Sequence, residues 1–138
     1  MSEGERIQLL AAALIVDDQG RVLLTRHAPH WKWHLPDGDS QFGLTLSASL
    51  RKALHGDLDV DIRIQTHQPA VIAEVLNPSA NRHFVILCYP AVITSGTPTE
   101  RPGTLEPGWF SEDMKDALRG NMYESSAHLL RKALGWKL

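Results

Sequence analysis

Hydrophobic and polar residues succeed one another along the chain in a pattern that predicts both strands and helices. Residues 8–16 form a continuous apolar run, residues 17–20 form a polar turn, and residues 21–26 are again largely apolar. Two apolar runs joined by a short turn that contains glycine predict a β-hairpin. The alanines within residues 10–14 also permit a helix over that part of the first run.

A helix is predicted after the polar loop of residues 37–40. Four apolar residues recur there at helical spacing, which gives one apolar stripe. They are Leu46, Leu50, Ala53 and Leu54. Thr45 or Ser47 is suited to cap the start of this helix. Gly56 is predicted to end it, since glycine commonly follows the last turn of a helix.

The rest of the chain predicts further strands and two C-terminal helices. The strands are expected at residues 57–64, 70–76, 83–94 and 109–110, and the helices at residues 112–118 and 122–134, with Gly135 as the end of the last one. Residues 95–108 are rich in glycine, proline and threonine, which is typical of a surface loop. Strands that are interrupted and followed by helices predict a mixed sheet with helices on its faces.

Composition narrows the class of protein. A chain of 138 residues suits one domain, over residues 1–138. The net charge of −2 gives no general reason to bind nucleic acid or an anionic membrane. No apolar run approaches the roughly 20 residues of a membrane-spanning helix. The first eight residues lack a signal-peptide pattern, and Cys88 has no second cysteine to pair with, so we expect a cytoplasmic protein with a buried thiol.

Three short motifs occur in a fixed order. They are VLLTR at residues 22–26, WHLPDG at residues 33–38 and WFS at residues 109–111, the last followed by a short acidic helix. With the order of strands and helices, they resemble the Nudix hydrolase family (MutT-like) over nearly the whole chain. The resemblance implies an α/β fold, a Nudix-like α/β/α sandwich with a mixed β-sheet. A homodimer is compatible with what it implies.

The family is defined by the motif G-x5-E-x7-R-E-U-x-E-E-x-G-U, in which U is a bulky apolar residue. In the family, the last three glutamates share one helix face because they stand at positions i, i+3 and i+4. They hold divalent cations, which bridge the diphosphate of the substrate and activate a water molecule. The arginine and the first glutamate support those ligands.

Most of these side chains are missing from this chain. An alignment without gaps matches the specified positions, in order, to Gly38, Leu44, Lys52, Ala53, Leu54, Gly56, Asp57, Asp59 and Val60. Asp57 is then the only carboxylate at the acidic positions. In an alternative register Gly56 is the second glycine and Arg51 lies near the arginine position, but residues 51–55 contain no acid. The sequence therefore predicts that the usual metal site is absent.

The degenerate motif favours a protein that binds a nucleotide or related diphosphate compound with little or no hydrolysis, a candidate pseudoenzyme without a certain cofactor. Loss of one acid–base group typically costs about 10²–10⁴ in rate. A first alternative is an active hydrolase of nucleoside-diphosphate derivatives that uses Mg²⁺ or Mn²⁺ at a relocated site. Its metal ligands are Asp57, Asp39 and Glu106, with Asp57 as the catalytic group. A further alternative is a non-catalytic scaffold or dimerisation module.

Several side chains are candidates to bind such a ligand. Arg26, Lys52 and Arg82 are cations that can meet a phosphate, and Trp31 can stack on a base. Gly38 lies in the loop that precedes the helix and can approach phosphates closely. For the cations, an exposed strand or helix face is the alternative role. Three histidines follow the spacing H-x2-H-x3-H and are candidate zinc ligands, namely His27, His30 and His34.

Overall fold

A computed structural model describes residues 6–66 and 68–138. Its strands are β1 (Gln8–Ile15), β2 (Val22–His27), β3 (Asp37–Asp39), β4 (Asp61–Ile64), β5 (Val71–Asn77), β6 (Arg82–Ser95) and β7 (Leu105–Phe110). Its helices are α1 (Leu46–Leu58), α2 (Lys115–Leu118) and α3 (Glu124–Leu134), with short 3-10 turns η1 (Pro78–Ala80) and η2 (Glu112–Met114). The predicted mixed α/β class is confirmed.

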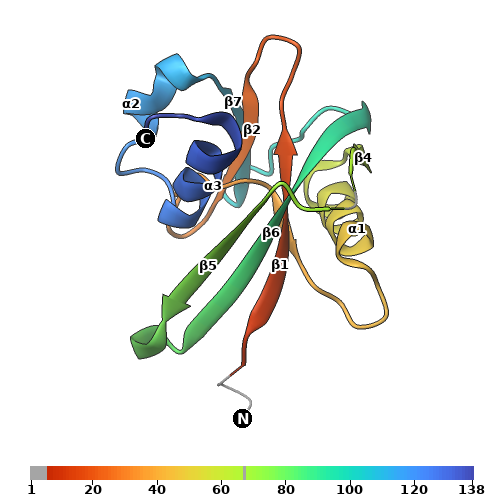
Figure 1. Cartoon of the computed structure of the whole chain (residues 1–138). Coiled ribbons are helices and arrows are strands. Elements are labelled where there is room, and N and C mark those ends of the chain that lie inside the picture. The colour runs from red at the N-terminus through yellow and green to blue at the C-terminus, as the bar shows by residue number, and fades with distance from the viewer. Residues whose placement is uncertain (1–5, 67) are drawn as a thin grey trace.

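The central sheet has the strand order β3-β1-β6-β4, and β5 also pairs with β6. β1 and β6 run parallel, and the other pairs are antiparallel. β1 and β6 are the inner strands, and their alanines, leucines and isoleucines suit burial on both sides. The long β6 spans the molecule in Figure 1 and carries β5 along its lower half and β4 along its upper half.

The predicted hairpin of β1 and β2 is wrong as a pairing, although both strands form. They share only the bridge between Val16 and Val22, after which β2 leaves the central sheet and pairs with β7. The turn itself is stabilised by the Asp17 carboxylate, which accepts from the backbone N–H groups of Gln19 and Arg21. Paired with β7, β2 buries Leu24 in the core on the α3 side and Leu23 in the core on the α1 side, so both leucines are fully buried.

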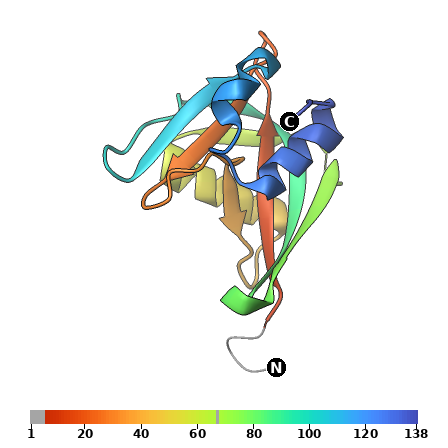
Figure 2. The same ribbon diagram turned by 90° about the vertical axis from the view of Figure 1, so that its left-hand side faces the viewer.

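Helices cover the sheet on two sides. α1 lies on one side, and α3 lies on the other beside β5, as Figures 1 and 2 show together. Each side has its own core. Leu50, Leu54 and Leu58 belong to the α1 side, whereas Leu129 and Leu130 belong to the α3 side. This is the predicted α/β/α arrangement.

α1 begins as predicted but ends later. Thr45 caps it, because its hydroxyl accepts from the Ala48 N–H at 3.1 Å. The prediction that Gly56 ends the helix is wrong. The helix continues to Leu58, which is 1% exposed, and Asp59 follows with a left-handed φ of 58°. Burial of a third leucine four residues after Leu54 stabilises the extra turn more than glycine disfavours it.

Three other segments differ from the predictions. Residues 37–39 form β3 instead of a loop, because they pair with Leu10 to Ala12 of β1. The strand predicted at residues 57–64 begins only at Asp61, so Asp57 lies on α1 and does not share a strand face with Asp61. β7 likewise begins at Leu105, inside the predicted surface loop. In each case pairing with a distant strand decides the structure, and local composition carries no signal of it.

The remaining elements agree with the sequence. β5, β6 and α3 form as predicted, and Gly135 ends α3 with a φ of 70°. Cys88 is fully buried in β6, and burial raises the pKa of its thiol to about 12, so it is an inert core residue. No helix among the described residues is long and apolar enough to cross a membrane.

Candidate functional site

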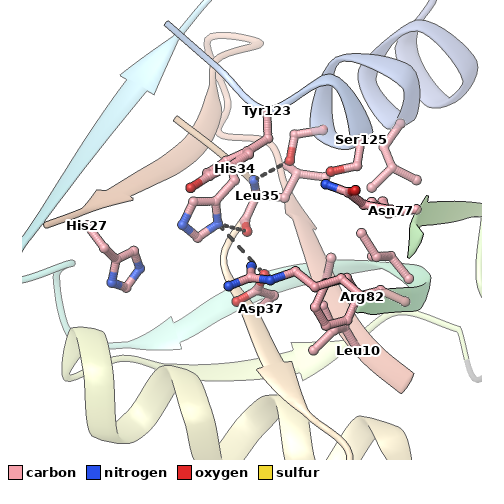
Figure 3. Close-up of a pocket in the computed structure, with 15 residues that line it drawn as sticks. Leu10, His27, His34, Leu35, Asp37, Asn77, Arg82, Tyr123 and Ser125 are labelled. Atoms are coloured by element: carbon pink, nitrogen blue, oxygen red, sulfur yellow. Dashed lines mark hydrogen bonds and ion pairs between the residues drawn. The ribbon is translucent and has the colours of Figure 1, made fainter. Parts of the chain in front are cut away.

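The main pocket opens between β1, β5, β6 and the start of α3, and its volume is about 480 Å³. Figure 3 shows side chains from these elements converging on it. Its polar lining consists of His27, His34, Asp37, Asn77, Arg82, Tyr123, Ser125 and Ser126, and its apolar lining of Leu10, Ala12, Leu35, Val75, Phe84, Ile86 and Leu129. An apolar hollow of this size with several convergent polar groups is typical of a small-molecule site.

Two hydrogen bonds fix the wall formed by residues 34–36. The Leu35 N–H donates to Ser126 Oγ at 3.0 Å, which joins this segment to the start of α3. His34 Nδ1 lies 2.8 Å from the Leu35 carbonyl oxygen. Since a carbonyl oxygen can only accept, His34 Nδ1 carries the proton and donates, and Nε2 is left as an acceptor.

His27 and His34 stack on one another, with ring centroids 4.9 Å apart and an interplanar angle of 17°. His27 ends β2, and His34 bridges back to Thr25 of the same strand through two backbone hydrogen bonds. Burial lowers the pKa of both imidazoles, and the neighbouring His34 lowers the pKa of His27 further. The pair is therefore uncharged at neutral pH.

Asp37 lies where three cavities meet. It lines the main pocket, the adjoining groove and a small cavity against α1. The pKa of Asp37 is raised to about 6, mainly by burial and to a smaller extent by the carboxylates of Asp39 and Asp57, while His27 acts in the opposite direction. The side chain keeps 39% of its surface exposed, so it remains accessible to a ligand.

Arg82 supplies the cation of the main pocket. It starts β6, opposite Asn77 at the end of β5, and both residues line the pocket. Arg82 also lines the adjoining groove of about 560 Å³, together with Arg6, Asp39 and His83. No ion pair of Arg82 occurs within residues 6–66 and 68–138, whereas His83 is paired with Glu74 at 2.6 Å. Arg82 is therefore the predicted substrate-binding residue that the fold brings to the pocket.

The face of α1 next to the sheet carries packing side chains in place of acids. Ala53 is half-buried, and a Cβ built on Gly38 would lie 2.6 Å from the Ala53 Cβ. Gly38 thus lets β3 approach α1 closely. Gly56 is exposed on the helix, and Leu44 is 43% exposed just before it.

Asp57 is the one carboxylate at this end of α1. It is exposed, and with His27 and Asp37 it lines the small cavity, whose volume is about 10 Å³. That space is too small for a phosphate group. Asp57 therefore lies outside the lining of the main pocket, to which Arg82 belongs.

The other predicted binding residues are engaged elsewhere. Arg26 makes two hydrogen bonds to Glu106, the shorter 2.7 Å, and its guanidinium lies 4.6 Å from the ring centroid of Trp33. Trp31 lies on the outer side of Arg26, 5.8 Å from the guanidinium to the ring centroid. The Lys52 amine donates to the Gln41 side chain at 3.3 Å. These predicted binding residues, Arg26, Trp31 and Lys52, do not line the main pocket.

The donors present do not fit a divalent cation of the kind that the resemblance implies. Mg²⁺ takes about six oxygen ligands and usually one or two carboxylates plus phosphates. Asp57, Asp39 and Glu106 are not brought together. Glu106, on β7, pairs with Arg26 of β2, and Asp39, on β3, accepts from the side chain of Gln8 of β1. Across the described part of the chain, no group of three or more His, Cys, Asp or Glu side chains is arranged to hold a metal. The predicted zinc group is also incomplete, because only His27 and His34 of its three histidines meet.

Several pocket residues were not singled out from the sequence, namely Asn77, Tyr123 and Ser125. They come from the end of β5 and the start of α3, which meet only in the folded protein. Asn77 had a local signal, since it precedes Pro78 in a turn, but that signal predicts backbone conformation. His27 and His34 had the clearest signal, although their spacing suggested zinc and not a pocket wall.

This fold is the Nudix fold. A Nudix hydrolase from Nitrosomonas europaea matches with a TM-score of 0.78 and 16% identity over 92% of this chain and 88% of that one. A MutT Nudix hydrolase from Burkholderia pseudomallei matches with a TM-score of 0.71 and 24% identity over 97% and 100% of the two chains. An ADP-ribose pyrophosphatase from Streptococcus suis matches with a TM-score of 0.57 and 21% identity over 77% and 75%. No protein-family model and no curated protein matches the sequence.

Proposed function

We propose that this Nudix-fold protein binds a nucleotide or related diphosphate compound in the main pocket and hydrolyses it little or not at all. The proposal rests on the contrast between a well-formed pocket and a helix, α1, that lacks most of the acidic side chains of the family motif. The pocket holds about 480 Å³ and a free cation, Arg82, within the described residues. The helix offers Ala53 and Gly56 where the family motif has two of its metal-facing glutamates.

The course of α1 supports the alignment without gaps. In that alignment Leu54 and Val60 take the bulky apolar positions, and they are 1% and 0% exposed. Asp59 takes the second glycine position, and it has a left-handed φ of 58°, a conformation that glycine adopts most readily. In the alternative register Asp57 would take the final apolar position, yet it is exposed. The first register leaves Asp57 as the single acid.

One carboxylate is a poor site for a divalent cation. Mg²⁺ is held by oxygen ligands, and the charge of the ion stays largely uncompensated beside Asp57 alone. The named activity of the Streptococcus suis neighbour, ADP-ribose pyrophosphatase, indicates the chemical class that this fold accommodates. In the present chain that class is proposed as a ligand and not as a substrate.

The proposal is tested by a paired measurement on the full chain. Calorimetry with nucleotides and ADP-ribose, with and without Mg²⁺ or Mn²⁺, measures binding, and a phosphate-release panel under the same conditions measures turnover. Binding without metal-dependent turnover is the expected result. Failure of every ligand to bind at millimolar concentration would leave the scaffold or dimerisation module as the better account.

The relocated metal site is the second outcome that this panel detects. It requires Asp57, Asp39 and Glu106 to act together, and Glu106 would first have to leave Arg26. Turnover above the blank that disappears in Asp57→Asn, but survives in the exposed control Asp18→Asn, would establish a hydrolase. That result would contradict the proposal directly.

A further inference from the structure

The charges of the side chains that line the main pocket limit which ligands it can bind. Among the described side chains that line it, only Arg82 and Asp37 carry a formal charge. His27 and His34 add none at neutral pH, because burial keeps both imidazoles in the uncharged form. The lining therefore has one cation and one acid, which is a poor match for the two or more negative charges of a diphosphate.

The two cavities that share Asp37 with the pocket also contain acids. The small cavity against α1 is lined by Asp57 as well as Asp37, and its volume is about 10 Å³. The adjoining groove is lined by Asp39 as well as Asp37, opposed by Arg6 and Arg82, and its histidine, His83, is paired with Glu74. The described lining of neither cavity has an excess of positive charge.

Three cations near α1 are engaged in other contacts and do not line the pocket. Arg26 is paired with Glu106, Lys52 donates to Gln41, and Arg101 donates to the Gly56 carbonyl oxygen. Arg51 is exposed on α1 and does not line the pocket either, so none of these cations adds to the charge of the pocket. Repulsion between phosphate and carboxylate is strong in a partly buried site, because water screens it less.

The remaining lining suits an uncharged, partly planar molecule. The apolar wall from Leu10, Phe84 and Leu129 can contact a flat ring, and the rim groups of Asn77, Tyr123 and Ser125 provide hydrogen bonds. Arg82 can pair with one phosphate at the edge of the pocket. A base, a sugar and a single phosphate together match this distribution of groups.

We infer that the pocket takes a nucleoside or a nucleoside monophosphate in preference to the corresponding diphosphate. The inference rests on the proposed function, since it specifies which member of the nucleotide class the same pocket favours. Asp37 is the residue that discriminates against the second phosphate, and Arg82 is the residue that accepts the first.

The experiment is calorimetry of the full chain with EDTA present. The probes are adenosine, guanosine, cytidine and uridine, each with its 5′-monophosphate and 5′-diphosphate, and inorganic phosphate and pyrophosphate alone. For the base that binds most tightly, the monophosphate should bind at least tenfold more tightly than the diphosphate. A diphosphate that binds as tightly as the monophosphate, or more tightly, overturns the inference while the proposed function stands.

Two variants separate the roles of the charged residues. Arg82→Gln should weaken the monophosphate about tenfold, to the affinity of the nucleoside, whereas the exposed β4 control Arg63→Gln should change nothing. Asp37→Asn should strengthen the diphosphate about tenfold and leave the nucleoside unchanged, with Asp18→Asn as its control. Equal effects of Asp37→Asn on all three ligands would overturn the inference, and the absence of binding by every probe would overturn the proposed function with it.

Discussion

The two faces of the central sheet differ: the face under α1 is filled by packing, and the face under α3 borders a pocket. On the α1 face, Leu50, Leu54 and Leu58 fill the space under the helix, and Gly38 brings β3 against Ala53. On the α3 face, Leu129 and Leu130 pack in the core, and the start of α3 borders a pocket of about 480 Å³ with several polar groups in its lining. A helix can therefore pack against a sheet whether or not it carries metal-binding acids, because packing and metal binding use different positions of the same helix.

The largest effect is expected for loss of a buried leucine, and it separates the two faces. Leu50→Ala and Leu129→Ala each remove a nearly fully buried side chain, and each should cost about 3 kcal/mol of unfolding free energy. Only Leu129 lines the pocket, so only Leu129→Ala should also change ligand affinity. Chemical denaturation measures the unfolding free energy. Titration calorimetry, at a temperature well below the unfolding transition, measures the ligand affinity. Equal changes in affinity for the two variants would show that the faces are not independent.

A smaller cost is expected where β3 meets α1. Gly38→Ala places a Cβ 2.6 Å from the Ala53 Cβ and 3.2 Å from the Ser49 carbonyl oxygen, which should destabilise the fold by about 2 kcal/mol. Ala53→Gly removes one of these contacts. Gly38→Ala should therefore cost less in the Ala53→Gly background than in the natural chain, even though glycine weakens the helix by about 1 kcal/mol. Identical costs in the two backgrounds would exclude close packing as the role of Gly38.

On the pocket side, Asp37 should make the protein less stable as the pH rises. Its ordinary pKa is 3.8, and burial raises it to about 6 in the folded protein. Between these values the unfolded chain releases the proton and the folded protein keeps it, so stability falls as pH increases through this window. Because the side chain is 39% exposed, solvent reduces the effect, and Asp37→Asn should stabilise by about 1 kcal/mol at pH 7.

The pH dependence distinguishes this cause from a simple loss of packing. The stability difference between Asp37→Asn and the natural chain should vanish below about pH 4, where both states hold the proton. Melting temperatures of the two proteins at half-unit intervals from pH 3 to 8 measure this difference. A difference that stays constant over this range would show that the charge of Asp37 is not responsible.

The smallest effect is a gain on α1. Gly56 lies inside the helix, is exposed, and has nothing within 4 Å of where a Cβ would lie. Gly56→Ala should raise stability by about 0.5–1 kcal/mol, because alanine favours the helix and loses less backbone freedom on folding. Chemical denaturation measures the free energy of unfolding. A lower value for Gly56→Ala than for the natural chain would indicate that Gly56 makes a contact outside the helix.

The sequence predicted most elements correctly where the signal was local. The leucine stripe of α1, the Thr45 cap, the long β6 and the end of α3 at Gly135 all follow from spacing and capping within one segment. The errors arise where distant segments meet. Residues 37–39 were predicted as a loop because the sequence Asp-Gly-Asp has no strand signal of its own and forms a strand by pairing with β1. β2 was predicted to pair with β1, but it pairs with β7.

The site shows the same division. Arg82 was a candidate from its charge alone, and the fold places it in the pocket. Arg26 had the same charge, but β7 brings Glu106 opposite to it at 2.7 Å. No local pattern distinguishes these two arginines, since the difference is made by strand pairing some 80 residues away along the chain. The absence of acids at Ala53 and Gly56, by contrast, is a property of the sequence itself.

Phosphorus NMR of the full chain with ligand and Mg²⁺ or Mn²⁺ tests whether this protein binds nucleotides without cleaving them. The probes are the nucleotides that bind in calorimetry and ADP-ribose, and the spectra follow binding and cleavage in one sample. We expect resonances that shift or broaden on binding while no metal-dependent product accumulates above the protein-free blank. Steady product formation that requires the metal and disappears in Asp57→Asn would contradict the account, because the single acid left on α1 would then suffice for catalysis.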